Sequence, residues 1–402
     1  MPHETALLAT IAVSLALAFV GGYVAFRLKL PPLVGYLLAG IVVGPFTPGF
    51  VADTKLAPEL AEIGVILLMF GVGMHFSVRD LLAVGGVAIP GAVGQILVAT
   101  ALGLGLAHLW GWSVGGGIVF GVALSVASTV VMMKALESRG GTGTTEGRIA
   151  VGWLIVEDLL MVLALVLLPV FAGLGSEASS SASSGLFATL AITLGKLAVF
   201  VAAMFVVGAR VFPWILGHVS RTGSRELFTL GVIALSVGVA YFSASLFGVS
   251  FALGAFCAGV LLNGSHLADR AAADIKPFED AFAALFFVAV GMLFDPAILV
   301  QEPLRVLAVL GVIVVGKSLA TFGIVRLLKQ PVRTARTVSA ALAQVGEFSF
   351  ILIGLGVALG MLPKEGQSLV LAGALLSIAM NPLVFWLVVR RDLSLPGLST
   401  HA

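Results

Sequence analysis

The stretch GWLIVEDLLMVLALVLLP, residues 152–169, holds two adjacent acids, Glu157 and Asp158, in a run that is otherwise apolar. A helix of about 20 apolar residues crosses the hydrocarbon core of a bilayer. A carboxylate at the bilayer centre costs at least about 2.5 kcal/mol on insertion scales, so such a residue tends to face a cavity or another charge. The stretch therefore predicts a membrane-spanning helix that carries a functional acidic site.

The composition of the whole chain also indicates a membrane protein. Of its 402 residues, 59% are hydrophobic and 10% are charged, against roughly 25% charged in soluble proteins. The net charge of +2 comes from dispersed basic residues, which argues against a nucleic-acid partner. Cys257 is the only cysteine, and the six histidines show no H-E-x-x-H spacing. We therefore expect no disulfide framework, no zinc chemistry, no enzymatic activity and no cofactor in this chain.

Charged breaks and breaks rich in Pro and Gly divide the apolar sequence into separate runs. These runs predict an all-α polytopic membrane protein with about thirteen transmembrane helices. The first run lacks the basic residues of a cleavable signal and is interpreted as a span. A serine-rich stretch, 176–185, predicts a surface loop. The predicted spans are 5–26, 32–46, 58–75, 82–108, 113–136, 148–172, 186–210, 226–247, 249–263, 279–294, 303–327, 335–360 and 367–390.

Lys and Arg residues predict the orientation of the spans. With the N-terminus outside, 17 of the 22 basic residues fall in inner loops and the tail, and three fall in outer loops. The remaining two, Lys196 and Lys317, lie within spans. Because cytoplasmic loops carry the excess of basic residues, we expect a periplasmic N-terminus and a cytoplasmic C-terminus in a bacterial inner membrane. Lys196 is expected to extend to an interface, without a role in transport.

An internal repeat relates the two halves of the chain. The segment VGYLLAG (34–40) recurs as LGAFCAG (253–259), and VGMHF (72–76) recurs as VGMLF (290–294), at offsets of 219 and 218 residues. The offset contains seven predicted spans, an odd number, so the repeats have opposite orientations. Inverted-topology repeats are typical of secondary transporters, whose substrate site lies near the midplane where the repeats meet.

The same offset pairs GVALSVASTVVMM (121–133) with SAALAQVGEFSFI (339–351), so that Ser128 corresponds to Gly346 and Thr129 to Glu347. Both stretches have small or polar residues in mid-span. A helix that unwinds there could offer carbonyl and hydroxyl oxygens to a cation. The alternative is that Ser and Thr only pack against neighbouring helices. The symmetric placement favours the first interpretation.

The charges inside the spans suggest distinct roles. Side chains of consecutive helical residues diverge by about 100°, so one of Glu157 and Asp158 is expected to face the ion path while the other serves a neighbour. Buried acids close together hold a proton more readily, which suits proton exchange. Lys317 is the natural counter-charge, although a helix-pinning ion pair is a rival interpretation. Glu347 either balances the dipole ends of a broken helix or lies near the inner leaflet.

These motifs together resemble the monovalent cation:proton antiporter-2 family, which includes the Kef-type potassium efflux systems. The motifs appear in the order of that family and extend over nearly the whole chain. They are PPLVGYLLAGIVVGP (31–45), LAEIGVILLMFGVGM (60–74), SVASTVV (125–131), the acidic pair Glu157–Asp158, FALGAFCAGVLLN (251–263), FFVAVGMLFDP (286–296), GKSL (316–319) and AQVGEFSFIL (343–352).

The resemblance implies a transmembrane antiporter domain over 1–391 with thirteen helices, two of them crossed and broken, and a homodimeric assembly that moves like an elevator. The core domain would contain the spans near 58–172 and 279–360. The dimerisation domain would contain those near 5–46, 186–263 and 367–390. Residues 392–402 would form a cytoplasmic tail. Many Kef-type proteins carry a cytosolic nucleotide-binding regulatory domain after the last helix, and we expect that domain to be absent from this chain.

By the same likeness, Asp158 would bind the transported K⁺ or Na⁺ and the proton in turn, and Lys317 would be the lysine of the core domain. The crossing break would contain 125–130, with Ser125, Ser128 and Thr129, and 344–347, with Gln344, Gly346 and Glu347. Relatives carry Asp, Asn or Gln at position 157, where this chain has Glu, which leaves stoichiometry and ion choice open.

The function expected is exchange of a monovalent cation, K⁺ ahead of Na⁺, for H⁺, in the service of pH homeostasis. The alternatives are a cation channel or efflux pore gated by a missing cytosolic domain, and an intramembrane enzyme. A channel is expected to carry a filter motif such as TVGYG, and a metal-dependent enzyme a motif such as H-E-x-x-H. The sequence contains neither of these two motifs.

Overall fold

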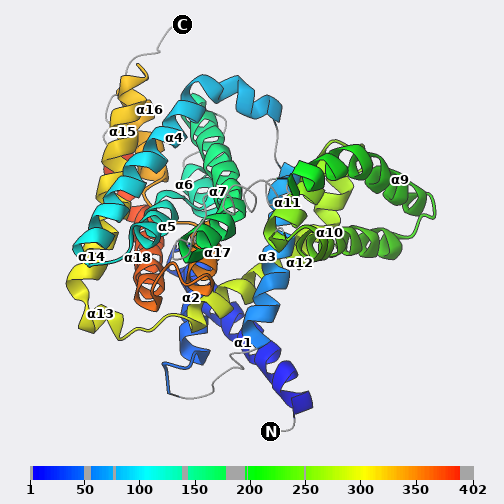
Figure 1. Ribbon diagram of the computed structural model, residues 1–402, viewed down its shortest axis with the longest axis horizontal. Helices are drawn as coiled ribbons and strands as arrows, with labels where there is room; N and C mark the ends of the chain where they lie inside the picture. The colour runs from blue at the N-terminus through cyan, green and yellow to red at the C-terminus, as the bar shows by residue number, and fades with distance from the viewer. Residues whose placement is uncertain are drawn as a thin grey trace, which may run out of the picture. The chain divides into compact units, whose positions relative to one another are not determined.

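The computed structural model describes residues 3–48, 56–75, 78–137, 144–177, 195–196, 198–248 and 250–389. The secondary-structure elements of these ranges are all helices (Figure 1). An all-helical protein is what a bilayer requires, because a helix satisfies its backbone N–H and C=O groups within one segment. The predicted all-α class is therefore confirmed.

Seven of the described helices are long and apolar enough to cross a membrane, and four shorter helices are also apolar. The long segments are Leu7–Arg27, Val84–Leu109, Thr145–Pro169, Ala198–Ser220, Arg225–Phe247, Pro303–Leu327 and Lys364–Val389. The short ones are Pro32–Val43, Val114–Ser125, Phe251–Asn263 and Glu347–Ala358. A multi-pass membrane protein follows from these helices, while the count of about thirteen spans stays a prediction.

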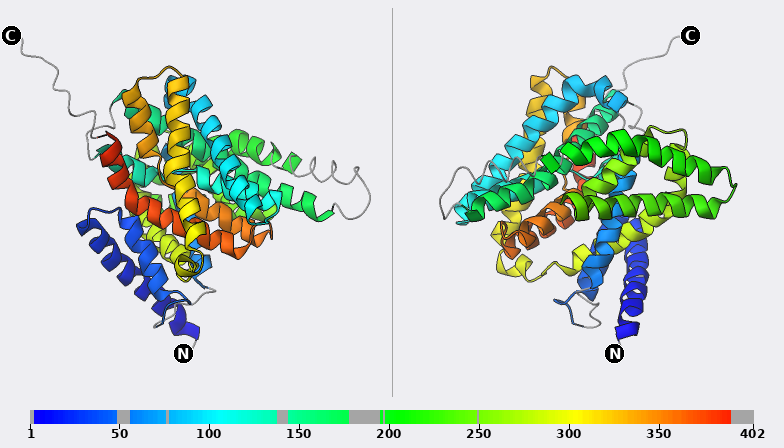
Figure 2. Two further views of the ribbon diagram at one scale, coloured as in Figure 1. Left: turned by 90° about the vertical axis from the view of Figure 1, so that its left-hand side faces the viewer. Right: turned by 45° about the vertical axis from the view of Figure 1, so that its right-hand side comes forward.

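The chain divides into two compact units. Unit 1 takes in the described residues of 1–23, 35–77 and 162–293. Its helices are most of α1 (His3–Arg27) and α2 (Pro32–Val43), all of α3 (Leu56–His75), the second half of α7 (Thr145–Glu177), the π-helix η1 (Met204–Gly208), α9 (Ala209–Ser220), α10 (Arg225–Phe247), α11 (Phe251–Asn263) and α12 (Ala268–Met292). In Figure 2, α1 lies beside α2, and α9 lies beside α10.

Glycines allow the helices of unit 1 to approach closely. A Cβ atom at Gly40 of α2 would overlap the backbone of α12 at Val288 and Gly291. A Cβ atom at Gly259 of α11 would likewise overlap the backbone of α3 at Gly73. Such small residues replace bulky side chains where membrane helices pack backbone to backbone. The sequence repeat matches Gly40 with Gly259 and Gly73 with Gly291, so equivalent glycines make equivalent contacts.

Unit 2 takes in the described residues of 24–34, 78–161 and 294–402. Its helices are α4 (Val78–Leu109), α5 (Val114–Ser125), α6 (Thr129–Glu137), the first half of α7, α13 (Ile298–Gln301), α14 (Pro303–Gly311), the π-helix η2 (Val312–Gly316), α15 (Lys317–Leu327), α16 (Val332–Ala341), α17 (Glu347–Ala358) and α18 (Lys364–Val389). Helix α15 packs between α4 and α16 (Figure 1).

Two spans of unit 2 are interrupted in their middle, as the sequence predicted. Helix α5 ends at Ser125 and α6 begins at Thr129, and Val126 between them has extended backbone angles, φ −89° and ψ 132°. Helix α16 ends at Ala341 and α17 begins at Glu347. The two breaks meet, because the Gly346 N–H donates a hydrogen bond of 3.0 Å to the Val126 carbonyl.

Several helix boundaries differ from those predicted. The span predicted at 186–210 continues through Arg210 to Ser220, and 186–194 lie outside the described residues. Arg210 is accommodated within the helix because its guanidinium donates to the Val206 carbonyl at 2.8 Å. Of the predicted loop 176–185, residues 176–177 belong to α7 and the rest is outside the described ranges.

Helix α12 begins at Ala268, eleven residues before the predicted start at 279. Its first turns are charged, which hid them from a search for apolar runs. Pairs at helical spacing stabilise such a segment by a few tenths of a kcal/mol each. Arg270 lies 4.0 Å from Asp274, and Lys276 lies 3.1 Å from Asp280.

The two compact units do not coincide with the predicted core and dimerisation domains. Helices α3 and α12, predicted as core, belong to unit 1 together with α11, and α18, predicted as scaffold, belongs to unit 2. The predicted domains are defined by relative movement, whereas the units are defined by packing within one conformation. The domain assignment stays a prediction.

Candidate ion-binding site

The candidate site lies within unit 2, where the α5–α6 break meets the α16–α17 break. The side chain of Gln344 bonds both backbone groups of Ser128: its Oε1 accepts from the Ser128 N–H at 2.9 Å and its Nε2 donates to the Ser128 carbonyl at 3.1 Å. The first bond satisfies the Ser128 N–H, which an unbroken helix would pair internally. The second adds a donor to a carbonyl that also accepts from the Met132 N–H. A Cβ atom at Gly346 would overlap the backbone of Ala127, so the crossing requires glycine there.

The two adjacent acids of α7 turn to different partners. Glu157 is fully buried, and its Oε2 accepts a hydrogen bond of 2.9 Å from the Ala127 N–H. Asp158 is 7% exposed, and its Oδ2 is 3.5 Å from the Thr129 hydroxyl. This divergence follows from the rotation of about 100° between consecutive helical residues. Glu157 thus holds the middle of the break, and Asp158 faces the start of α6.

Lys317 is fully buried at the start of α15, directly after the π-helix η2. Its ammonium group donates a hydrogen bond of 2.9 Å to the Gln344 carbonyl. The carboxylate that interacts with its charge is Glu157. Asp158 interacts instead with the like charges of Glu347 and Glu157. Lys317 is therefore the counter-charge of Glu157, without a direct ion pair between them, and Asp158 has no neighbouring cation among the described residues.

Two carboxylate oxygens of α7, Glu157 Oε1 and Asp158 Oδ1, are buried and accept no hydrogen bond from the described part of the chain. Of the two, Asp158 Oδ1 belongs to the acid without a neighbouring cation. A buried carboxylate oxygen without a donor costs free energy unless a proton, a cation or water meets it. The arrangement can therefore hold a proton or a small cation at this oxygen.

The other residues predicted for the site have supporting positions. The Ser125 hydroxyl donates to the Val122 carbonyl of its own helix at 2.7 Å, and the Ser128 hydroxyl accepts from the Val131 N–H at 3.4 Å. Glu347, 3% exposed, is the first residue of α17. Lys196 is exposed. Thr129 is the one hydroxyl of the predicted set that reaches a carboxylate of α7.

Sequence reasoning missed two residues of the site, Gln95 and Trp153. Gln95 of α4 is fully buried and donates from Nε2 to the Ser125 carbonyl at 2.8 Å. Its Oε1 accepts from the indole N–H of Trp153 at 3.4 Å. An available signal was an amide side chain within the apolar run IPGAVGQILVATALG (89–103), because polar groups inside a membrane require partners.

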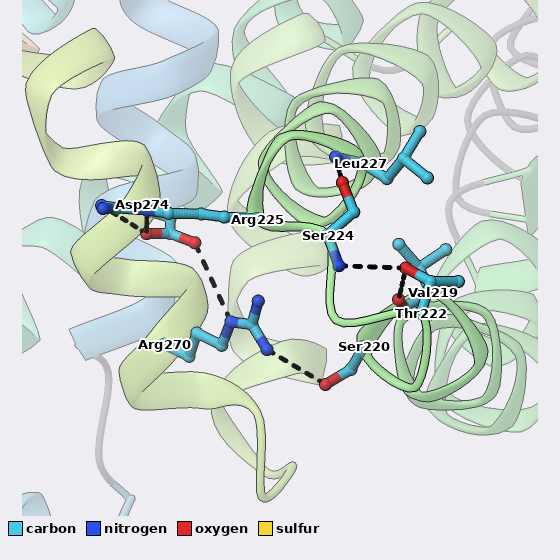
Figure 3. Close-up of polar contacts among 8 residues, drawn as sticks. All are labelled: Val219, Ser220, Thr222, Ser224, Arg225, Leu227, Arg270 and Asp274. Carbon is cyan, nitrogen blue, oxygen red and sulfur yellow. Dashed lines mark hydrogen bonds and ion pairs between the residues drawn. The ribbon is translucent and has the colours of Figure 1, made fainter.

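A second charged cluster lies within unit 1 (Figure 3). Asp274 of α12 accepts from Arg225 of α10 at 2.9 Å and lies 4.0 Å from Arg270. Arg270 also donates to the Ser220 hydroxyl at 3.1 Å and stacks 4.2 Å from the ring centre of Phe228. The cluster joins α10 and α12 and is structural. Within the described ranges, no group of three or more His, Cys, Asp or Glu side chains could hold a metal ion.

The fold is that of an ion antiporter. The structure is similar to that of the sodium proton antiporter MjNhaP1 from Methanocaldococcus jannaschii at pH 8, with a TM-score of 0.71 over 95% of this chain and 98% of that one. The sequence identity is 18%, so this likeness concerns the fold alone.

The family follows from the sequence. Residues 15–390 match the family described as "Sodium/hydrogen exchanger, transmembrane". The chain belongs to this family.

Individual proteins are similar to this chain over most of its length. The chain is 60% identical to the "Putative cation/proton antiporter YbaL" of Escherichia coli (strain K12), over 97% of this chain and 70% of the relative. It is 34% identical to K(+) efflux antiporter 4 of Arabidopsis thaliana, over 89% of this chain and 60% of that one. It is 33% identical to the iron transporter MagA of Paramagnetospirillum magneticum (strain ATCC 700264 / AMB-1), over 97% and 86%. The predicted resemblance to Kef-type antiporters is confirmed, because a glutathione-regulated potassium-efflux system protein KefC of Cronobacter sakazakii (strain ATCC BAA-894) is 32% identical over 92% of this chain and 58% of that one.

Proposed function

We propose that the chain exchanges a monovalent cation for H⁺ by alternating access across a bacterial inner membrane, with Asp158 as the shared site. The family and the cation/proton antiporter at 60% identity support exchange. The names of the potassium-efflux relatives favour K⁺ as the substrate, with Na⁺ as the alternative. The observation that carries the proposal is that Asp158 combines a buried oxygen, Oδ1, that accepts no hydrogen bond from the described residues with the lack of a neighbouring cation among them, whereas Glu157 has Lys317.

One carboxylate can couple two opposite flows because it holds one ligand at a time. An ionised carboxylate attracts a cation, which prefers hard oxygen ligands such as the Thr129 hydroxyl nearby and the carbonyls of a broken helix. A proton that binds the same carboxylate neutralises its charge, so the cation is released. If the carrier changes its orientation only when the site is occupied by one or the other, each cation that crosses is exchanged for protons.

The neighbouring groups would keep this site open and in place. Glu157 binds the Ala127 N–H and balances Lys317, so the fixed positive charge of the site is compensated without Asp158. Gln344 binds both backbone groups of Ser128. These contacts support roles in which Glu157, Lys317 and Gln344 shape the break while Asp158 exchanges its ligand.

The architecture proposed is a homodimer of thirteen-span subunits built from inverted repeats, with an outer N-terminus and an inner C-terminus. Equivalent glycine contacts support the repeat: Gly40 meets Gly291, and Gly259 meets Gly73. The breaks support it as well, since α6 and α17 begin at Thr129 and Glu347, which are 218 residues apart, the offset of the VGMHF and VGMLF segments. Elevator-like movement of a core domain would then carry Asp158 between the two sides.

The experiment is cation-driven proton movement in proteoliposomes with an internal pH dye. Adding K⁺ or Na⁺ to wild-type vesicles should dissipate an imposed pH gradient. Asp158→Asn preserves size but cannot ionise, so it should abolish the signal in protein that is still folded and dimeric. Glu157→Gln should be milder, because an amide oxygen can still accept from Ala127. If Asp158→Asn exchanged near the wild-type rate while Glu157→Gln did not, the two roles would be reversed. Cation flux without proton movement would indicate a channel.

The pH dependence follows from competition at one carboxylate. As pH falls, protons displace the cation from Asp158, so the half-saturating cation concentration should rise. As pH increases, the supply of protons limits the return step, so the rate should fall again. The rate measured at a fixed, subsaturating cation concentration should therefore follow a bell-shaped profile against pH. A half-saturating concentration independent of pH would contradict a shared site.

A further inference from the structure

The break between α5 and α6 is connected to α7 by three successive links. The Ser125 carbonyl accepts from Gln95, which in turn accepts from Trp153 of α7. The Ala127 N–H donates to Glu157, and the Thr129 hydroxyl donates to Asp158. Because the backbone between Ser125 and Thr129 is extended at Val126, residues two apart can present groups to the same neighbour. The three links therefore set where Thr129 stands relative to Asp158.

The three links differ in what can change during transport. The Thr129–Asp158 contact must loosen and re-form as the carboxylate exchanges its ligand. The Ala127–Glu157 bond involves a charged group that Lys317 compensates. Only the Gln95 link contains no ionisable group, since it consists of an indole N–H, an amide and a carbonyl. It can hold the break in one position whatever the site contains.

The burial of this link makes it rigid. Gln95 and Trp153 are both fully buried, and a Cβ atom at Gly91, one turn before Gln95 on α4, would overlap the Trp153 ring. Helix α4 and the indole are thus in direct contact. Trp153 lies four residues before Glu157 on α7, so the Gln95 link and the Glu157 link leave the same face of that helix. A change at Gln95 therefore acts on α7 next to the Glu157 link.

The amide of Gln95 also fixes the direction in which the Ser125 carbonyl points. Carbonyls at the end of a helix lack the donors that a further turn would provide. At the end of α5, the Ala123 carbonyl accepts from Ser349, and the Val126 carbonyl accepts from Gly346. Gln95 occupies the Ser125 carbonyl in the same way. With its carbonyl held toward α4, this peptide has a fixed orientation, and the position of the Thr129 hydroxyl four residues later, beside Asp158, is restricted with it.

We propose that Gln95 is a positioning residue that sets the geometry of the cation site and thereby its preference between K⁺ and Na⁺. Selectivity between these ions depends on cavity size and on how firmly the oxygen ligands are held. Gln95 touches no substrate; it acts through the Ser125 peptide and Trp153. The proposal rests on the cation exchange proposed above.

The test measures half-saturating K⁺ and Na⁺ concentrations, together with maximal rates, in proteoliposomes of wild type and Gln95→Met. Methionine keeps the length of the side chain and removes both hydrogen bonds. The ratio of the two half-saturating concentrations should change by about fivefold, which corresponds to roughly one net hydrogen bond. Maximal rates should change less than this ratio. Gln330→Met is the matched control, because Gln330 follows α15, is half-buried and lies outside the site, and it should keep the wild-type ratio.

A second variant tests the same bond in case Gln95→Met does not fold. Gln95→Glu keeps the length and polarity of the side chain, and its carboxylate can accept from Trp153 but has no amide to donate to Ser125. It should shift the same ratio. If folded protein of either variant kept the wild-type ratio, Gln95 would only fill space and the proposal would be wrong, while wild-type exchange would leave the proposed function intact. If wild type itself moved no protons on addition of either cation, both proposals would fail.

Discussion

Lys317→Met tests whether the buried lysine compensates Glu157 or Asp158. The substitution removes the hydrogen bond from the ammonium group to the Gln344 carbonyl and the charge that interacts with Glu157. Removing one member of a buried charge pair destabilises proteins by about 3–5 kcal/mol, because the other charge stays buried without compensation. We expect a loss of this size for Lys317→Met alone.

A second substitution should restore part of that loss at one position only. In Lys317→Met/Glu157→Gln both members of the pair are neutral, so neither leaves the other as an uncompensated charge, and the amide oxygen can still accept from the Ala127 N–H. What remains is the lost bond to Gln344, worth about 1.5–3 kcal/mol for a charged donor. The double variant should therefore be roughly 2 kcal/mol more stable than Lys317→Met. Lys317→Met/Asp158→Asn should show no comparable recovery.

The assay is thermal unfolding of wild type, the three single variants (Lys317→Met, Glu157→Gln and Asp158→Asn) and the two double variants in one detergent at one pH, read as loss of the dimer or monomer peak. The order of the melting temperatures gives the answer, and a double-mutant cycle gives the coupling between the two positions. Transport per folded molecule is measured in parallel. If Asp158→Asn rescued Lys317→Met as well as Glu157→Gln did, the assignment of Lys317 to Glu157 would be wrong.

Two further predictions concern the crossing and the orientation. Gly346→Ala would place a methyl group on the backbone of Ala127, so folded yield and transport should both fall. Gly354→Ala, within α17, meets open space and should behave as wild type. Equal behaviour of the two variants in fluorescence-detected size exclusion would contradict the crossing. A reporter at the N-terminus should be accessible from the periplasm and one at the C-terminus from the cytoplasm, and both on one side would contradict an odd number of spans.

Several parts of the fold could be predicted from sequence because the bilayer limits the choices. An apolar segment in lipid must satisfy its own backbone groups, so long apolar runs predict helices. The interruption after Ser125 was predictable because SVAST places small and polar residues in mid-span. Its partner near Gly346 followed from the repeat offset. Each of these signals is local, or is a comparison of the chain with itself.

Other features depended on information that apolar runs do not contain. The charged start of α12 at Ala268 is stabilised by side-chain pairs at helical spacing, not by hydrophobicity. The continuation of the helix beyond Arg210 depends on a bond to the Val206 carbonyl. Both segments are helical for reasons of local hydrogen bonding and charge, so a hydropathy reading ends them too early.

The side-chain partners within the site were the least predictable part. The sequence indicates that Lys317 needs a carboxylate, but Glu157 and Asp158 are adjacent, and only the rotation of α7 decides which of them faces it. Gln95 bonds a carbonyl 30 residues away on another helix. Such pairings depend on how α4, α7 and α15 pack around the break, and no spacing within one helix encodes that packing.

The division of roles between the two acids has a physical reason. An acid that anchors a broken helix needs a permanent donor, and a counter-charge that compensates it where it is buried; Glu157 has both in Ala127 and Lys317. A transport acid must lack a permanent counter-charge, because a fixed ammonium beside it would compete with the arriving cation. Asp158 has carboxylate neighbours and a buried oxygen that no described group donates to. Two consecutive acids can meet these opposite requirements because the helix turns them to different sides.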